Sequence, residues 1–267
     1  MIAVLLRELK DRRMAVLAYC LTVIALLVVY MSVFPSVHTQ MEQFQKLYES
    51  YPKGLYRALG IENLSVSTLE NYLAIEQFSI VWPVLAILFS ASLAGASIAG
   101  QIEKGMLGFY LALPLRRLSI YGAKFAAGAM HIAIFTAVSV LGIAPLAALF
   151  HNTVSLRNLC SLSIVSLLFA LAVYAFTLFL SACFSERSKA YMLTGGMLIL
   201  MYVANVVAEL KTSLSWLAKC SIFHYYNAQD VISSGHLQCS SLAVFAAALF
   251  LFTLAGALVF HHRDIAA

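Results

Sequence analysis

Charged residues are scarce in this 267-residue chain, where Asp, Glu, Lys and Arg together make up 11% of the sequence. A soluble domain usually has about a quarter of its residues charged. The five cysteines are scattered, without a C-x-x-C pair or a Cys/His spacing typical of a metal site. These absences argue against a soluble domain and predict no bound metal. Cys220 and Cys239 fall in one loop, where they form either a disulfide or two free thiols.

Signatures of catalysis and nucleotide binding are also missing. Gly100 and Gly105 have the first spacing of a phosphate-binding G-x-x-x-x-G-K-[ST] loop, but Met106 stands where the lysine is required. No H-E-x-x-H motif or aspartate pair lies within an apolar stretch, so we expect a non-enzymatic chain that binds no cofactor. Basic residues are not interleaved with aromatic ones on a soluble surface, which excludes a nucleic-acid partner.

Apolar residues are abundant, at 62% of the chain with a mean hydropathy of +0.89. Six apolar stretches are near or above the roughly 20 residues that a helix needs to cross hydrocarbon. They cover Ala15–Phe34, Ala74–Gly100, Gly122–Phe150, Leu159–Phe184, Ala190–Ala208 and Ser241–Phe260. We therefore predict an all-α, polytopic membrane protein with one transmembrane domain over residues 1–267. The first stretch is too long for a signal-peptide core, so we expect it to be a retained span.

The distribution of basic residues predicts the orientation, because cytoplasmic loops carry an excess of Lys and Arg. If all six stretches span, one face has the cations Arg7, Lys10, Arg12, Arg13, Lys104, Arg116, Arg117, Lys124, Arg187, Lys189 and Arg263. The other face has fewer, spread over longer loops: Lys46, Lys53, Arg57, Arg157, Lys211 and Lys219. We predict a multi-pass protein of the inner or plasma membrane with both termini in the cytoplasm.

Polar residues within the spans are few. Glu76 and His131 have no obvious charged partner at helical spacing, which weakens any ion-coupled mechanism. In the second span Ala91, Gly95 and Ala99 recur every four residues, a spacing that lets two helix backbones approach closely. This pattern fits packing within the chain, a contact between subunits, or a span that lines a pathway.

The segments that precede the first and the last spans are both predicted to be helical. Residues 2–9 place Ile2, Leu5, Leu6 and Leu9 on one helical face, opposite charged side chains, which predicts an amphipathic helix in the membrane interface before the chain turns inward. A simple positively charged anchor is the alternative. The last long loop, over residues 209–240, is unusually apolar, so we expect re-entrant or interfacial helices there, with an aromatic belt as the simpler interpretation.

The most specific stretch is the connector 101–117 between the second and third spans. After Gly105, the apolar side chains of Met106, Leu107, Tyr110 and Leu111 fall on one helical face until Pro114 ends the helix. A short helix with an apolar face must bury it, against either the lipid interface or a soluble partner. Glycine at its start supplies an irregular backbone between two helices.

Four motifs in order carry a resemblance to a known family. They are Arg7-Glu8-Leu9-Lys10, then Glu103-Lys104-Gly105 with Pro114, Arg116-Arg117 and Lys124, then residues 221–227 (SIFHYYN), and Arg263-Asp264-Ile265. On a six-span scaffold this chain resembles the membrane subunits of type-2 ATP-binding-cassette (ABC) exporters. Met106 stands where the family often has threonine, and Ile222 where it often has proline.

The resemblance implies an exporter permease that pairs with a second copy or paralogue and with a separate cytoplasmic P-loop ATPase, which holds ATP and Mg²⁺. It assigns ATPase coupling to Glu103, Gly105, Met106, Leu107, Tyr110, Leu111, Pro114, Arg116 and Arg117. It assigns an elbow helix to Arg7, Glu8 and Lys10, and an outer gate to Phe223, Tyr225 and Tyr226. Arg116, Arg117 and Lys124 also fit plain topogenic charge. The alternative function is a standalone secondary transporter or channel-like carrier.

Overall fold

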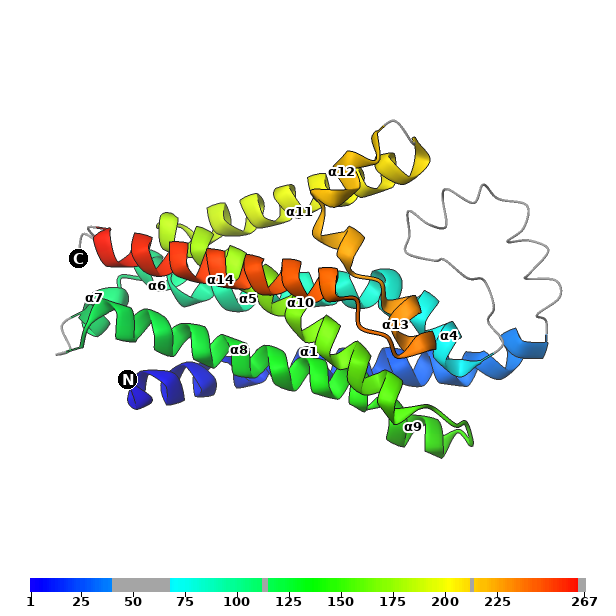
Figure 1. Cartoon of the computed structure of the whole chain (residues 1–267). Coiled ribbons are helices and arrows are strands. Elements are labelled where there is room, and N and C mark those ends of the chain that lie inside the picture. The colour runs from blue at the N-terminus through cyan, green and yellow to red at the C-terminus, as the bar shows by residue number, and fades with distance from the viewer. Residues whose placement is uncertain (40–67, 112–114, 212–213, 264–267) are drawn as a thin grey trace.

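The computed structural model describes residues 1–39, 68–111, 115–211 and 214–263, which fold into a bundle of long helices (Figure 1). No strand occurs among these described residues. Six helical segments are long and apolar enough to cross a membrane: Ile2–Val37, Leu69–Ser97, Arg117–Leu149, Leu156–Cys183, Arg187–Ala208 and Cys239–His262. The all-helical fold is confirmed for the described residues, and each predicted span corresponds to one of these six candidate helices.

The N-terminal region differs from our expectation of a separate elbow helix. Helix α1 runs without interruption over Ile2–Thr39, 38 residues that extend about 57 Å at about 1.5 Å per residue. The helix is continuous because its only proline is Pro35 and it contains no glycine. The predicted amphipathic segment is therefore the first two turns of the first span.

The second span is built from three consecutive pieces, α4 (Leu69–Leu73), the π-helix η1 (Ala74–Val81) and α5 (Trp82–Ser97). Pro83 is in the first turn of α5 and has no backbone N–H to donate to the preceding turn. The Ser79 hydroxyl donates to the Ala74 carbonyl at 2.9 Å within η1. The π-helix η1 therefore ends just before Pro83 in the sequence.

Helix α10 (Leu156–Cys183) lies at the centre of the bundle and packs against α5, α8 (Arg117–Leu141) and α14 (Cys239–His262). Helix α9 (Ile143–Leu149) continues α8 after Gly142. Hydroxyl groups on α10 are buried and hydrogen-bonded, as where Ser181 accepts from the Ala99 backbone N–H at 2.9 Å. Such bonds satisfy polar groups that would be costly in an apolar interior.

Helix α11 (Arg187–Leu210) packs on α5, and short helices follow it: α12 (Trp216–Lys219), η3 (Ile222–Tyr225) and α13 (Ala228–Ser234). Helix α13 folds back onto α10 and η1. The last long loop is therefore largely helical, as predicted. Its cysteines Cys220 and Cys239 are exposed free thiols.

Gly95 shows which contact the small-residue pattern of the second span serves. An added Cβ at Gly95 would lie 2.2 Å from Cε1 of Tyr191 on α11. The Tyr191 hydroxyl also donates to the Ser92 carbonyl of α5 at 3.2 Å. Gly95 therefore provides close helix packing within this chain.

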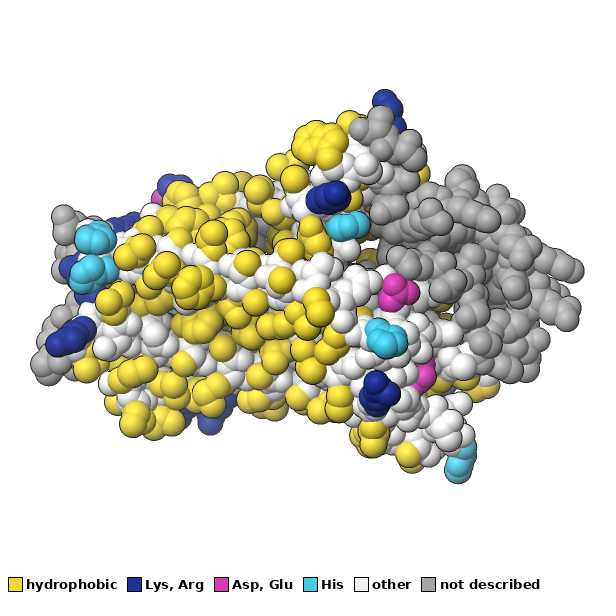
Figure 2. Space-filling view, in the orientation of Figure 1, with side chains coloured by type: hydrophobic (Ala, Val, Ile, Leu, Met, Phe, Trp, Pro, Cys, Tyr) yellow, Lys and Arg dark blue, Asp and Glu magenta, His cyan; other side chains and the backbone are white. Residues whose placement is uncertain are grey.

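The two described chain ends lie at the same end of the bundle, which we call the terminal end (Figure 1). The short helices α6 (Ala99–Glu103) and α7 (Leu107–Leu111) lie there as well. Figure 2 shows Lys and Arg side chains gathered at this end, with a broad apolar surface between the two ends of the bundle. The connectors that we expected to share one face do share it.

Candidate functional site

The connector between the second and third spans reverses direction at Gly105. Helix α6 ends there because Gly105 has a φ of 65°, a left-handed conformation that costs other residues about 1–2 kcal/mol. The Met106 backbone N–H then donates to the Gln101 carbonyl at 2.9 Å, closing the turn. Glycine at this position supplies the irregular backbone that we expected, and α7 starts two residues later.

Helix α7 presents a different face to its surroundings from the one we expected. Leu107 and Tyr110 are 1% and 6% exposed, so they pack inside this chain and are not available to a partner. Phe109, which we did not single out, is 77% exposed, and Met106 is 37% exposed. The Leu111 side chain and Pro114 lie outside the described residues. The exposed apolar group of this helix is therefore Phe109.

Lys124 of α8 lies at the centre of a buried polar cluster at the terminal end. Its ammonium donates to the Glu8 carboxylate of α1, to the Ser97 carbonyl at 2.8 Å and to the Gln101 side-chain oxygen at 2.6 Å. The Gln101 amide donates to the same Glu8 oxygen at 2.7 Å. All three ammonium protons thus have an acceptor, which is what a buried lysine requires.

Tyr110 of α7 extends this cluster to the connector. Its ring centroid lies 4.9 Å from the Lys124 ammonium and 5.5 Å from the Arg7 guanidinium, both within cation–π range. Burial, and then the neighbouring Glu8 carboxylate, raise the pKa of Tyr110, so its hydroxyl stays neutral at physiological pH. We call Glu8, Gln101, Tyr110 and Lys124 the charged junction; it joins α1, α6, α7 and α8.

Two of the sequence predictions change at this junction. Glu8 was placed on the polar arc of an elbow helix, but it is 4% exposed because its face of α1 packs against α8. Lys124 was interpreted as topogenic charge or as a partner contact, but it is 1% exposed and paired with Glu8. His131, two turns further along α8, is also buried. The sequence feature that could have predicted the charged junction was the position of Lys124 inside the third apolar stretch.

Other predicted site residues hold the connectors together within the chain. Arg117 donates to the Arg263 carbonyl at 2.6 Å, and Arg263 donates to the Ala182 carbonyl at 2.7 Å, so arginines satisfy the last carbonyls of α14 and α10. Glu103 accepts from the Arg187 backbone N–H at 3.0 Å, at the start of α11. These contacts tie all the described connectors of the terminal end to one another.

The remaining predicted residues lie on the surface of the terminal end. Arg116 is exposed at the N-cap of α8. Arg7 pairs with Asp11 at 3.8 Å on the outer side of α1, and Lys10 is exposed. Exposed pairs of this kind contribute little to stability.

The predicted gate residues lie toward the other end of the bundle. Tyr226 is buried, stacks on Trp82 at 5.9 Å between ring centroids, and shares a 3.2 Å hydrogen bond with the Ser166 hydroxyl. Burial raises the pKa of Tyr226. Tyr225 donates to the Lys219 carbonyl at 3.2 Å. Tyr226 therefore belongs to the aromatic core of the bundle, and Tyr225 to the fold of its own loop.

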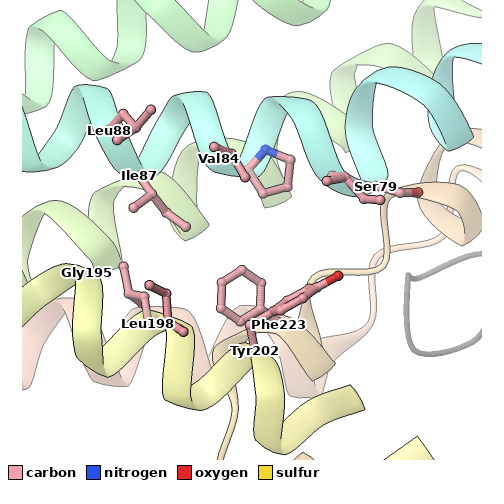
Figure 3. Close-up of a pocket in the computed structure, with 11 residues that line it drawn as sticks. Ser79, Val84, Ile87, Leu88, Gly195, Leu198, Tyr202 and Phe223 are labelled. Carbon is pink, nitrogen blue, oxygen red and sulfur yellow. The ribbon is translucent and has the colours of Figure 1, made fainter. Parts of the chain in front are cut away.

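Phe223 contributes to a cavity of about 360 Å³ between the second and fifth spans. Figure 3 shows Val84, Ile87 and Leu88 on one helix opposite Leu198 and Tyr202 on the other. The lining is almost entirely apolar, with Ser79 at one edge. A cavity of this size and lining suits an apolar group of a small molecule.

The family described as "ABC-2 family transporter protein" matches residues 2–265, which is nearly the whole chain. No curated protein matches the chain.

Proposed function

Because the chain belongs to the ABC-2 family of transporter proteins, we propose that it is the permease subunit of an ATP-driven exporter. In this proposal two permease subunits, identical or paralogous, enclose the pathway. Separate cytoplasmic P-loop ATPase subunits bind ATP and Mg²⁺ and supply the energy. The terminal end, with both termini, then lies in the cytoplasm, in agreement with its many basic residues.

The observation that carries this proposal is the charged junction. Tyr110 of the short helix α7 packs on the Lys124 ammonium, and Lys124 is bonded to Glu8 of the first span. A displacement of α7 therefore acts directly on α1 and α8, because a buried and fully paired charge cannot separate from its partner without a large penalty. Helix α7 has the position and the connections of a lever between an ATPase and the spans.

Phe109 is the group that we propose docks on the ATPase. It lies on the same helix as Tyr110, but its side chain is exposed whereas Tyr110 is buried in the junction, and this helix lies at the terminal end (Figure 1). Met106, Glu103 and Lys104 are exposed beside it. An aromatic anchor within a polar rim is the usual composition of an energetically dominant contact.

The apolar cavity between α5 and α11 supports a cargo with an apolar part. Its walls come from two spans and from Phe223, and the Tyr202 ring lies 5.5 Å from the Phe223 ring. Phe223, which belongs to the last long loop, would then close the cavity on the side of that loop, the role expected of a gate residue. We propose an amphiphilic cargo for this reason.

The alternative, a carrier that works without an ATPase, requires a titrating group along the pathway. The buried charges of Glu8 and Lys124 are the strongest observation in its favour among the described residues. They lie near the terminal end, away from the cavity, and the Lys124 protons are all engaged. This arrangement favours a structural joint over a proton carrier.

The test is ATP hydrolysis by the reconstituted complex. The full chain is tagged, purified from its native cells with the ATPase that accompanies it, and placed in proteoliposomes. We expect the ATPase to hydrolyse ATP at a different rate when bound to the permease than when alone. Transport that continues after the ATPase has been removed would contradict the proposal and favour the carrier.

A further inference from the structure

A second cavity, of about 310 Å³, lies at the terminal end among α1, α6 and the start of α11. Three cations line it, Arg12, Lys104 and Arg187, together with the carboxylates of Asp11 and Glu103. Its volume is at the lower end of the range for small-molecule sites, roughly 300–1,000 Å³. Gln101 of the charged junction also lines this cavity, but none of the cavity's charged side chains takes part in the junction.

The carboxylates at this cavity are already engaged. Glu103 accepts from the Arg187 backbone N–H, and Asp11 pairs with Arg7 on the outer side of α1. They therefore do not use the donor groups of the three cationic side chains. The three cations outnumber the two carboxylates at this cavity.

The cations, by contrast, keep donors available. Arg12 uses Nη2 to donate to the Ala96 carbonyl at 2.9 Å, while its Nε is buried and, in the part of the chain that the structure describes, has no hydrogen-bond partner. Arg187 uses Nε on the Tyr191 hydroxyl. Lys104 is exposed, and no bond to another described residue involves its ammonium. Two guanidinium groups and an ammonium around one cavity suit an anion with several acceptor oxygens, above all a phosphate.

The surroundings of the cavity indicate where such a phosphate comes from. Met14 lies one turn from Asp11 on α1 and starts an exposed apolar stripe that continues through Leu17 and Leu21. In a membrane this stripe faces acyl chains. Basic pockets between spans on the cytoplasmic side are known to bind anionic headgroups. We propose that this cavity binds the headgroup phosphate of an anionic phospholipid, with the acyl chains along the α1 stripe.

Native mass spectrometry of the full chain in detergent tests this site, with phosphatidylglycerol and phosphatidylcholine titrated separately. We expect phosphatidylglycerol to bind at least about tenfold more tightly. Lys104→Gln and Arg12→Gln should each weaken its binding about fivefold, the effect of one basic group near a membrane surface. Lys189→Gln and Arg13→Gln remove the same charge at the same end but outside the cavity, and they should leave binding unchanged.

Lys104→Gln keeps the test decisive if Arg12→Gln fails to fold, because the Lys104 side chain is exposed. Equal weakening in the control variants would show diffuse surface charge and overturn the site. Displacement of phosphatidylglycerol by equimolar inorganic phosphate would identify a soluble ligand and overturn the lipid assignment. Unchanged lipid binding in Lys104→Gln with loss of the accompanying ATPase would assign the cavity to an acidic protein segment, and would also overturn it.

Discussion

Glu8 and Lys124 are 116 positions apart in the sequence and form an ion pair whose side chains are 5% and 0% exposed. Their burial requires that α1 and α8 keep one register, because a shift of either helix by a turn would leave both charges unpaired in an apolar interior. The pair also holds Gln101 and Tyr110 in place through shared contacts. It is therefore the point at which the connector and the first and third spans become one mechanical unit.

Removal of one charge from this pair should destabilise the protein more than removal of both. Glu8→Gln or Lys124→Met alone leaves a buried charge unpaired, which costs about 3–5 kcal/mol, whereas the double variant Glu8→Leu/Lys124→Met should recover most of that loss. Thermal unfolding of the purified chain in detergent measures the difference. The exposed pair of Arg7 and Asp11 is the matched control, and its neutralisation should cost less than about 1 kcal/mol. Single variants as mild as this control would disprove the buried pair.

The Tyr110 ring, and not its hydroxyl, should be what couples α7 to the junction. Tyr110→Phe keeps the ring over Lys124 and should preserve both stability and the ATPase response. Tyr110→Leu removes a cation–π contact of about 0.5–2 kcal/mol and should reduce the response while the protein still inserts. The measurement is the ATP hydrolysis rate of the reconstituted complex for both variants. Equal rates in the Tyr110→Phe and Tyr110→Leu variants would mean that the ring has no part in coupling.

The six spans could be predicted from the sequence because the length of an apolar stretch is a local property that a bilayer imposes. The charged junction could not, because Glu8 at helical spacing reads as one of several charges opposite Ile2, Leu5 and Leu6. Only the distant Lys124 determines which side of α1 is buried. A helical period shows which residues share a face, but it does not show what that face packs against.

The same reason explains why the exposed residue of α7 was not predicted from the sequence. Leu107 and Tyr110 were correctly placed on one face of a short helix, and this face was expected to bind a partner. The turn at Gly105 instead folds α7 back onto this chain, so the face is buried internally. Phe109 is isolated outside this face and gives no periodic signal.

Gly105 should be required for the position of α7. Gly105→Ala places an alanine at a φ of 65°, which should cost about 1–2 kcal/mol or rotate α7 away from the junction. Gly122→Ala is the matched control, since an added Cβ meets no atom within 4 Å at either position but Gly122 lies inside helix α8. There alanine should be neutral or stabilise by about 0.5–1 kcal/mol. Thermal unfolding and the ATPase response are measured for both, and equal behaviour would contradict a need for glycine at this turn.

Cysteine labelling tests the proposed orientation. Cys220 and Cys239 are exposed free thiols away from the terminal end, so a membrane-impermeant maleimide should label them in intact cells. A Lys104→Cys variant in a background with the exposed Cys160, Cys220 and Cys239 replaced by serine should be labelled only after the membrane is opened. Labelling of the Lys104→Cys variant from outside intact cells would reverse the orientation and remove α7 from the cytoplasm.

Photo-cross-linking at Phe109 tests the proposed ATPase contact most directly. A benzoylphenylalanine replaces Phe109 in one strain and Phe250 in another, since these two phenylalanines are 77% and 72% exposed, on α7 and within the last span respectively. After irradiation of native cells, we expect position 109 to cross-link to a protein whose peptides contain a P-loop motif, and position 250 not to do so. Absence of an ATPase adduct at position 109, or an equal yield at position 250, would contradict the role of α7 as the lever.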